Sequence, residues 1–392
     1  MIYLHIPFCH RKCAYCAFYS VAGTTGKDDY IDALRREIAA RHCFFGTEQW
    51  KPKTLYVGGG TPSSLNIGQL QRIAQSLREH FDLSALQEAT IECNPEDLTE
   101  EFLDNLSGIN LFDRISIGIQ SFDDNQLRRM NRRHTAKQAR TAVCNTDKAG
   151  FRKLSIDLIY GLPNQDTTDW EHELYEVEKL NATLSHPIGH LSCYALTVEP
   201  GTILERQVKS NQVIMPDEDL QVAHYEALCH WATESGYEQY EVSNFAQPGQ
   251  RSQHNSGYWN RTPYLGLGAA AHSFDGHCRR WNVADVARYT ASAIAGPVEY
   301  EEEELTVRDA YNEYVMTALR TTDGIDKRLI APPMAAHLAQ SVKNYLEQGW
   351  LTETATHYKP TSAGLLLADR MATELFVTSP PQESEEAPVT EA

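Results

Sequence analysis

The sequence predicts an α/β fold built on a parallel sheet, because two kinds of segment alternate over its first 200 residues. Short apolar, β-branched runs alternate with longer stretches whose apolar residues have helical spacing. Strands that are each followed by a helix form right-handed βαβ units. Such units build either a barrel or a doubly wound open sheet, and periodicity alone leaves both architectures open.

The predicted strands are "IYLHIP", "TLYVGGG", "ATIECNP", "RISIGIQS", "KLSIDLIYGLP" and "HLSCYAL". The stretches with helical spacing between them are "DDYIDALRREIAARHCFF", "IGQLQRIAQSLREHF", "TAKQARTAVCNTDKAG" and "DWEHELYEVEKL". A chain of 392 residues is long enough for one large domain and a smaller one.

Beyond residue 200 the pattern changes. The stretch "PDEDLQVAHYEALCHWATESGY" predicts a helix that begins near Asp217 or Asp219 and ends before Gly236. "YEQYEVSNFA" is typical of a strand, and the Gly- and aromatic-rich residues 251–282 predict a loop. "AGPVEYEEEE" predicts a polar linker.

The last part of the chain predicts a mainly helical, winged-helix-like domain, since it has the order helix, helix, short hairpin, helix. We therefore expect an α/β domain over residues 1–245 and a Gly/aromatic loop region over 246–296. The helical domain would follow over 297–378. Residues 379–392 carry four Glu and no Lys or Arg, which predicts a disordered acidic tail.

Composition narrows the classes of function. Hydrophobic residues make up 42% and charged residues 22% of the chain, as in soluble globular proteins. The net charge of -18 argues against general nucleic-acid binding. The sequence has no run of about 18 apolar residues that would predict a transmembrane segment, which leaves peripheral membrane contact open. Nine cysteines without a secretory signal predict a cytoplasmic protein.

A cysteine-rich loop follows the first predicted strand. In "HIPFCHRKCAYCAFYS" three cysteines stand at Cys9, Cys13 and Cys16, and Phe18 occupies the place where a fourth could be. Four-cysteine iron-sulfur clusters and structural zinc sites each bind four protein ligands. Three thiolates leave one iron of a 4Fe-4S cluster open to another ligand, so the loop predicts such a cluster.

Two other interpretations of these cysteines compete with the cluster. One is a zinc site that His5 or His10 completes. The other is a set of incidental free cysteines, which are often buried as small hydrophobic residues. The second interpretation suits the cysteines that lie in helical or strand patterns, which are Cys43, Cys93, Cys144, Cys193 and Cys229.

Polar and glycine residues stand at the ends of the predicted strands. Cys9, the segment 58–61, Glu92, Gln120 and Asp157 each lie at or just past the end of an apolar run. Ligands of parallel α/β folds bind at the carboxyl ends of the strands. The sequence therefore predicts one site that collects these residues.

The segments "YLHIPFC", "YVGGGTPS", "IECNPED", "SIGIQSF" and "IDLIYGLP" resemble the radical S-adenosylmethionine superfamily. The branch they resemble contains oxygen-independent coproporphyrinogen III oxidase and the HemW-type haem chaperones, and the resemblance covers roughly residues 2–375. It implies a partial (β/α)6 barrel. It also implies that Cys9, Cys13 and Cys16 hold a 4Fe-4S cluster.

The same resemblance implies an S-adenosylmethionine site. Gly59 and Gly60 would let the backbone approach the ligand, as glycines do. Glu92 and Gln120 would meet ribose hydroxyls, and Arg132 would meet the carboxylate. The complete set that the resemblance implies is Tyr3, Tyr15, Gly59, Gly60, Thr61, Glu92, Gln120, Arg132 and Asp157.

The stretch "HNSGYW" resembles the His-Asn-x-x-Tyr-Trp motif of haem chaperones, which implies haem contacts from His254, Asn255, Tyr258 and Trp259. Imidazole is an axial ligand of haem iron, and Asn255 could orient it. The competing interpretation is a loop histidine that caps a turn beside two core aromatic residues. His272 is a weaker haem candidate.

Two departures separate this chain from the oxidases of that branch. The oxidases end the loop in Cys-x-Cys, where this chain has Phe18, and they carry an extension before the first strand. We therefore expect a haem chaperone that uses a 4Fe-4S cluster and S-adenosylmethionine and delivers haem to client haem proteins. The alternative is an oxygen-independent coproporphyrinogen III oxidase or another radical enzyme acting on a tetrapyrrole. A purely structural iron-sulfur or zinc protein is the third class.

Overall fold

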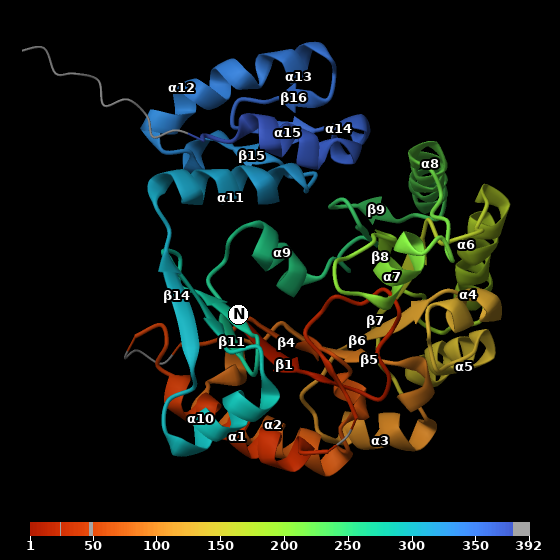
Figure 1. Ribbon diagram of the computed structural model, residues 1–392, viewed down its shortest axis with the longest axis vertical. Coiled ribbons are helices and arrows are strands. Elements are labelled where there is room, and N and C mark those ends of the chain that lie inside the picture. The colour runs from red at the N-terminus through yellow and green to blue at the C-terminus, as the bar shows by residue number, and fades with distance from the viewer. Residues whose placement is uncertain (24, 47–49, 379–392) are drawn as a thin grey trace, which may run out of the picture. The chain divides into compact units, whose positions relative to one another are not determined.

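The computed structural model describes residues 1–23, 25–46 and 50–378 (Figure 1). The predicted acidic tail, residues 379–392, lies outside the described residues. The chain forms two compact units. The larger contains Met1–Tyr258 and Thr262–Glu303, and the smaller contains Trp259–Arg261 and the chain from Glu304 onward.

The larger unit is built on one nine-stranded sheet with the order β11-β1-β4-β5-β6-β7-β8-β10-β9. The strands from β11 to β8 are parallel, and β10 and β9 continue the sheet antiparallel. Their bounds are β1 Ile2–Ile6, β4 Thr54–Gly59, β5 Glu88–Cys93, β6 Arg114–Gln120, β7 Lys153–Tyr160, β8 His190–Ala195, β9 Glu238–Gln239, β10 Asn244–Ala246 and β11 Leu265–Leu267.

The order of the strands decides between the two predicted architectures. From β1 to β8 each main strand lies beside the next one in sequence, without the reversal that defines a doubly wound sheet. All six predicted strands are present. The partial barrel is thus confirmed and the open doubly wound sheet is wrong.

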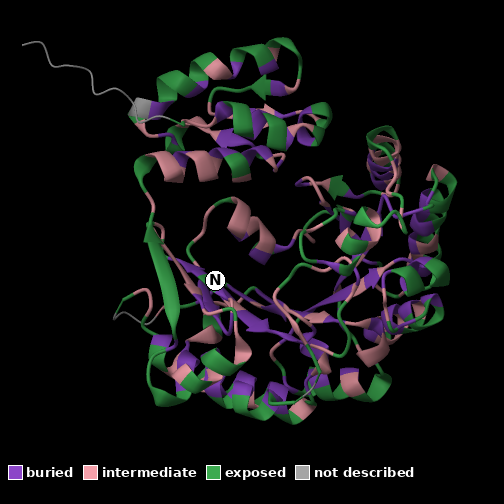
Figure 2. Ribbon diagram, viewed as in Figure 1, coloured by how far each residue is buried: buried purple, intermediate pink, exposed green. Residues whose placement is uncertain are grey.

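Helices connect the parallel strands and lie along one side of the sheet (Figure 1). Their apolar faces pack on the strands, as Ile31, Leu34 and Ile38 of the first helix show, and Figure 2 shows the strands themselves as largely buried. These helices are α1 Lys27–Arg41, α2 Ile67–His80, α3 Glu100–Gly108, α4 Asp124–Arg129, α5 Ala136–Lys148 and α6 Thr167–Asn181. Helices α7 Ile203–Lys209 and α8 Glu218–Glu234 follow β8.

Local sequence explains where the helices begin and end. The side chain of Asp217 caps α8 by accepting a hydrogen bond from the Leu220 N–H at 2.9 Å. Gly236 follows the helix with a φ of 78°, in the left-handed region. The predicted helix is therefore confirmed, whereas the strand predicted after it divides into β9 and β10.

The Gly- and aromatic-rich region is not the predicted loop. It forms helix α9 (Gln253–Trp259), strand β11, and the antiparallel strands β12 (His272–Phe274) and β13 (Cys278–Asn282). Gly257 within α9 suggested a loop, but a Cβ at that position would lie 2.1 Å from Met1 Sδ. The glycine is needed because the Met1 side chain fills that space.

The predicted polar linker is also wrong in part, because Tyr300–Glu304 forms strand β14. It follows α10 (Val286–Ala295) and completes a three-stranded sheet with β12 and β13. The acidic strand is exposed along its whole length. Backbone pairing rather than burial holds it, which is why its sequence has no alternating pattern.

The smaller unit has its own hydrophobic core, which includes Val315, Leu319, Ile325 and Met371. Its elements follow the predicted order, with the added strand β15 completing the sheet β15-β17-β16. They are α11 Val307–Leu319, β15 Ile325–Asp326, α12 Pro332–Ser341, α13 Lys343–Glu347, β16 Leu351–Glu353, β17 His357–Pro360, α14 Ser362–Leu366 and α15 Ala368–Leu375.

Within the described ranges, the helices are all too short or too polar to cross a lipid bilayer.

Candidate functional site

The cysteine loop is closed at its base by backbone pairing. The short parallel strands β2 (Phe8–Cys9) and β3 (Val21–Ala22) pair Cys9 with Ala22, and the Gly23 N–H donates to the Cys9 carbonyl at 2.9 Å. Both ends of the loop are thus fixed directly after β1. A short loop between fixed ends can hold its three thiols in one place.

Two neighbouring segments hold the middle of this loop. The Ala14 N–H donates to the Met130 carbonyl at 3.0 Å, and the Ala14 carbonyl accepts from the Leu204 N–H at 2.8 Å. The Asn131 side-chain amide donates to the Lys12 carbonyl at 2.8 Å. The segment after α4 and the start of α7 therefore position the loop.

The thiols of Cys9, Cys13 and Cys16 are free and partly exposed. Burial raises the pKa of Cys9 and of Cys16. The Thr61 hydroxyl lies 3.5 Å from Cys9 Sγ, and Arg132 Nη1 donates to Cys13 Sγ at 3.4 Å. Two of the three thiols are thus tied to the segment 58–61 and to Arg132.

Arg132 is the centre of a small network that joins three strand ends. Its Nη2 donates to Asn94 Oδ1 at 2.9 Å and to the Gly118 carbonyl at 2.5 Å. Its Nε is buried and has no hydrogen-bond partner among the described residues. A buried donor without an acceptor is costly, so this atom suits a bound carboxylate.

Asn94 belongs to the site but was missed in the sequence. Its side-chain amide donates to the Thr61 hydroxyl at 3.4 Å while its carbonyl oxygen accepts from Arg132. Its place directly after the last residue of β5 was the available signal. A polar residue there faces the same rim as the other strand ends.

Gly59 packs against the barrel interior rather than leaving an open path. Its φ is 112°, and a Cβ there would lie 2.5 Å from the His5 ring. The Gly59 N–H donates to Glu92 Oε2 at 3.0 Å. Positive φ and the nearby imidazole therefore both require glycine at this position.

Gly60 packs against the start of the cysteine loop. Its N–H donates to the Ile6 carbonyl at 2.8 Å, and a Cβ would lie 2.8 Å from the Pro7 carbonyl carbon and 2.9 Å from the Phe8 carbonyl oxygen. We expected this glycine to give a ligand access to the backbone. Its visible role is close contact between two backbone segments.

Two carboxyl groups lie within the barrel. Glu92 accepts from the Tyr56 hydroxyl at 2.7 Å, and burial raises its pKa. Burial and the charge of Glu92 raise the pKa of Asp157 to about 7. The Ser116 hydroxyl lies 3.3 Å from Asp157 Oδ1. Burial and the like charge of Glu92 therefore favour the protonated form of Asp157 below neutral pH.

The remaining predicted residues line the same end of the sheet or the barrel interior. Gln120 ends β6 with a φ of 70°. The Tyr3 hydroxyl bonds His5 Nδ1 at 3.0 Å. Burial and the nearby Cys13 raise the pKa of Tyr15. The structure thus brings the cysteine loop, the segment 58–61, Glu92 and Arg132 to the rim formed by the carboxyl ends of the strands. Asp157 was expected at a strand end but lies in the middle of β7, because the apolar residues Leu158 and Ile159 continue the strand past it.

The zinc interpretation that uses His5 does not fit the geometry. Both ring nitrogens of His5 are occupied, by the Tyr3 hydroxyl and by the Tyr19 carbonyl at 2.9 Å. Over the part of the chain that the structure describes, no three His, Cys, Asp or Glu side chains converge on a single ion. In a 4Fe-4S cluster each thiolate binds a different iron, so the donor set of the loop fits a cluster.

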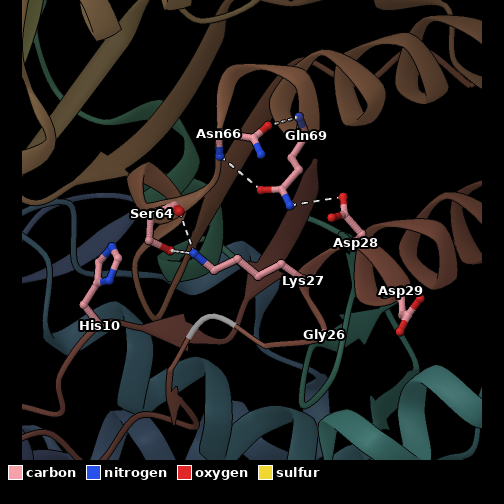
Figure 3. A pocket seen from close by; sticks show the side chains of 8 residues that line it. All are labelled: His10, Gly26, Lys27, Asp28, Asp29, Ser64, Asn66 and Gln69. Atoms are coloured by element: carbon pink, nitrogen blue, oxygen red, sulfur yellow. Dashed lines mark hydrogen bonds between the residues drawn. The ribbon is translucent and has the colours of Figure 1, made fainter.

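A pocket of about 510 Å³ opens beside the cysteine loop (Figure 3). Lys27 Nζ donates to the Ser64 carbonyl at 2.5 Å, and Gln69 donates to Asp28 at 3.2 Å. Burial lowers the pKa of Lys27. These contacts tie the start of α1 to the turn after the segment 58–61, while His10 is exposed at the edge.

The "HNSGYW" segment lies at the opposite end of the strands from the cysteines. His254 Nδ1 bonds the hydroxyl of Thr54, the first residue of β4, at 2.8 Å. The His254 N–H donates to Glu88 Oε1 at 3.0 Å, and Glu88 is the first residue of β5. Helix α9 therefore begins beneath the amino ends of these strands, whereas Cys9 follows the carboxyl end of β1.

His254 is fully buried and both of its ring nitrogens are engaged. Nε2 bonds the Tyr258 hydroxyl at 3.1 Å, and the imidazole lies 5.1 Å from the Tyr56 ring. Burial lowers the pKa of His254 to about 3. Asn255 and Trp259 are half-buried. Of the two sequence interpretations, the observed contacts are those of a structural histidine.

Glu88 and Arg114 anchor α9 and were missed in the sequence. Glu88 Oε2 accepts from the Gln253 N–H at 3.1 Å and lies 3.6 Å from Arg114 Nη1. Arg114 Nη1 also donates to the Gln250 carbonyl at 3.1 Å. Both side chains are buried. A charged residue at the start of a strand is usually exposed, so the local sequence did not indicate this role.

The chain matches two family models. Residues 3–174 match the radical SAM superfamily, and residues 305–367 match the HemN C-terminal domain. A heme chaperone HemW of Bacillus subtilis is 32% identical over 94% of this chain and 97% of its own length. The chain belongs to the HemW family. Relatives with the same name in Escherichia coli and Lactococcus lactis are 31% and 36% identical over 97% and 82% of their lengths.

The fold of the HemW-family chain also resembles a solved structure. The coproporphyrinogen III oxidase HemN from Escherichia coli, described as a radical SAM enzyme, has a TM-score of 0.81 and 25% sequence identity. The similarity covers 95% of this chain and 89% of the oxidase. This chain and the oxidase therefore share the partial barrel and the C-terminal helical domain.

Proposed function

We propose that this chain is a haem chaperone that holds a 4Fe-4S cluster with S-adenosylmethionine and delivers haem to client proteins. The observation that carries the proposal is the 32% identity with a relative named heme chaperone over 97% of that relative's length. The cysteine loop supports the cluster, because its three free thiols lie on one loop beside Thr61 and Arg132.

For the cluster, Cys9, Cys13 and Cys16 are the proposed ligands. When bound, the cluster supplies an iron without a protein ligand, to which an amino acid can bind through its amino and carboxylate groups. Arg132 would meet the carboxylate with its Nε, which lacks an acceptor among the residues that the structure describes. Thr61 and the backbone of the segment 58–61 would face the amino group.

The other residues would orient the nucleoside part of S-adenosylmethionine. Glu92 accepts one hydrogen bond at each oxygen, from Tyr56 and from Gly59, and a carboxylate oxygen has a second lone pair for a ribose hydroxyl. Gln120 is the last residue of β6, and Asp157 lies in the middle of the neighbouring strand β7. Tyr3 and Tyr15 would complete the lining.

For haem, His254, Asn255, Tyr258 and Trp259 remain the proposed segment. In the structure described here, iron could bind His254 only after the imidazole left Thr54 or Tyr258. Haem binding through this residue would therefore require α9 to change its contacts. The position of α9 at the amino ends of β4 and β5 keeps it apart from the cysteine loop.

The oxidase remains the second candidate, because the similarity to HemN covers almost the whole chain. One residue argues against it. Phe18 stands in the place of the cysteine with which the oxidase loop ends, and 75% of its surface is exposed. The phenyl side chain has no group that could replace a thiol at this position.

Anaerobic reconstitution followed by two assays tests the proposal. The protein should bind hemin and pass it to an apo-haem protein, and it should leave coproporphyrinogen III unchanged when S-adenosylmethionine and a reductant are added. Decarboxylation of coproporphyrinogen III would make it an oxidase. Failure to bind hemin would remove the chaperone assignment.

A further inference from the structure

The ribbon of β12 and β13 carries an imidazole, an indole and a guanidinium on one face. His272 pairs directly with Trp281, and Phe274 pairs with Arg279. Residues that pair directly, and those two positions along a strand, share a face of the sheet. His272, Trp281 and Arg279 are therefore neighbours on the same side of the ribbon.

His272 is an exposed histidine whose ring is already held in place. It stacks on the Trp281 indole with a centroid distance of 5.8 Å and an angle of 24°. Neither ring nitrogen has a hydrogen-bond partner within the described residues. This contrasts with His254 and His5, whose nitrogens are all occupied.

The imidazole lies beside the barrel and not on a remote surface. Gly266 of β11 pairs with Tyr3 of β1, and a Cβ on Gly266 would lie 1.8 Å from the His272 carbonyl oxygen. Strand β12 thus crosses directly over Gly266. The charge of His272 also lowers the pKa of His5, after the larger effect of burial.

Arg279 supplies a positive charge on the same face. Its guanidinium lies 6.0 Å from the Phe274 ring, and Nη1 is 3.6 Å from Glu303 Oε1. The surrounding protein, and then Arg279, lower the pKa of His272, which favours the neutral imidazole that binds metals. Haem presents an iron, a flat macrocycle and two carboxylates.

We propose that His272 is the ligand through which haem iron would bind in this conformation, with the edge of the Trp281 indole toward the macrocycle and a propionate at Arg279. The inference deepens the proposed haem chaperone function and rests on it. The propionate would replace the Glu303 carboxylate as the partner of the Arg279 guanidinium. In the same conformation His254 holds α9 in place through Thr54 and Tyr258.

Hemin titration of the reconstituted full chain tests the ligand. The readouts are the dissociation constant and the ferric haem electron paramagnetic resonance spectrum, because an oxidised 4Fe-4S cluster is silent there. His272→Ala should weaken hemin binding about tenfold or more and change the iron spectrum. His272→Gly should regain the original spectrum when imidazole is added.

His277→Ala is the matched control, since His277 is an exposed histidine in the turn of the same ribbon. It should bind hemin as the unaltered protein does. Wild-type affinity and spectrum in His272→Ala, with loss in His254→Ala, would overturn the assignment while leaving the chaperone function intact. Absence of hemin binding by the unaltered protein would remove both.

Discussion

At the scale of residues, Cys13 is the cysteine that the site contacts most directly, because Arg132 donates to its sulfur. We predict that Cys13→Ala abolishes the cluster, since a cube with only two protein ligands is not retained. Iron and labile sulfide measured after anaerobic reconstitution will check this. Cys43→Ala should leave both unchanged, because Cys43 is exposed after α1. Bound zinc without sulfide would contradict the cluster.

Asp157 gives the site a pH dependence. Its pKa is about 7 in the folded protein against an ordinary value of 3.8. The folded protein therefore holds this proton when the unfolded chain has lost it, and the free energy of unfolding falls as pH rises from about 4 to about 7. The shift corresponds to roughly 4 kcal/mol at most.

Asp157→Asn should remove this loss of stability at high pH, because the amide carries no titratable proton. We expect a higher free energy of unfolding for the cluster-free variant at pH 8, and no change at pH 4. Denaturant unfolding at the two pH values measures the difference. Asp104→Asn, at an exposed position of α3, is the control and should change neither value. An equal effect at both pH values would show that Asp157 is not the group responsible.

Residue identities were predictable where a strand end marked them. Glu92 and Gln120 stand at the ends of apolar runs, so their common rim followed from the topology, whereas Asp157 lies in the middle of β7. The contacts of His254 could not be predicted from the sequence, because its partner Thr54 is 200 residues away. Neither spacing nor composition relates two such positions.

At the scale of elements, the segment 58–61 and the cysteine loop are packed backbone against backbone. We predict that Gly60→Val moves the loop, since the new side chain would meet the carbonyl groups of residues 6–8. Cluster iron and S-adenosylmethionine affinity should both fall, and calorimetry with iron analysis will show it. Gly108→Val is the control, because a Cβ at Gly108 meets open space. If S-adenosylmethionine binding were lost while the cluster iron stayed normal, Gly60 would instead serve to give the ligand access to the backbone, as the sequence suggested.

Helix α9 depends on the buried pair of Glu88 and Arg114. We predict that Glu88→Ala lowers the free energy of unfolding by about 3–5 kcal/mol, because it leaves the Arg114 charge buried without its carboxylate. Amide hydrogen exchange should accelerate across α9. Glu100→Ala removes an exposed contact at 3.9 Å to Lys148 and should cost less than about 0.5 kcal/mol. Unchanged exchange in Glu88→Ala would contradict the anchoring role.

The elements missed in the sequence share a physical cause. Strand β11 has three residues, too few to show a period, and it exists because β1 offers it an edge. Strand β14 is acidic and exposed on both faces, so only pairing to the rest of its sheet defines it. Helix α9 contains a glycine that Met1 requires. In each case the decisive partner is distant in sequence.

At the scale of the whole molecule, the two units have separate hydrophobic cores. We predict two calorimetric unfolding transitions. Leu319→Ala should lower the free energy of unfolding of the smaller unit only, and Leu34→Ala that of the larger unit only. Each loss should be about 2–5 kcal/mol, since both side chains are fully buried. Iron content should stay normal in Leu319→Ala. A single transition that shifts with either variant would show that the units unfold together.

The pairing of β1 with β11 bears on how the protein is made. Strand β1 lies between β4 and β11, and residues Leu265–Leu267 of β11 are synthesised long after β1 leaves the ribosome. Until then one edge of β1 has unpaired backbone groups, directly before the cysteine loop. Exposed strand edges in incomplete chains attract other strands. We therefore expect insertion of the proposed iron-sulfur cluster after translation has passed residue 267, because a nascent chain arrested earlier would present its thiols on an unfinished sheet.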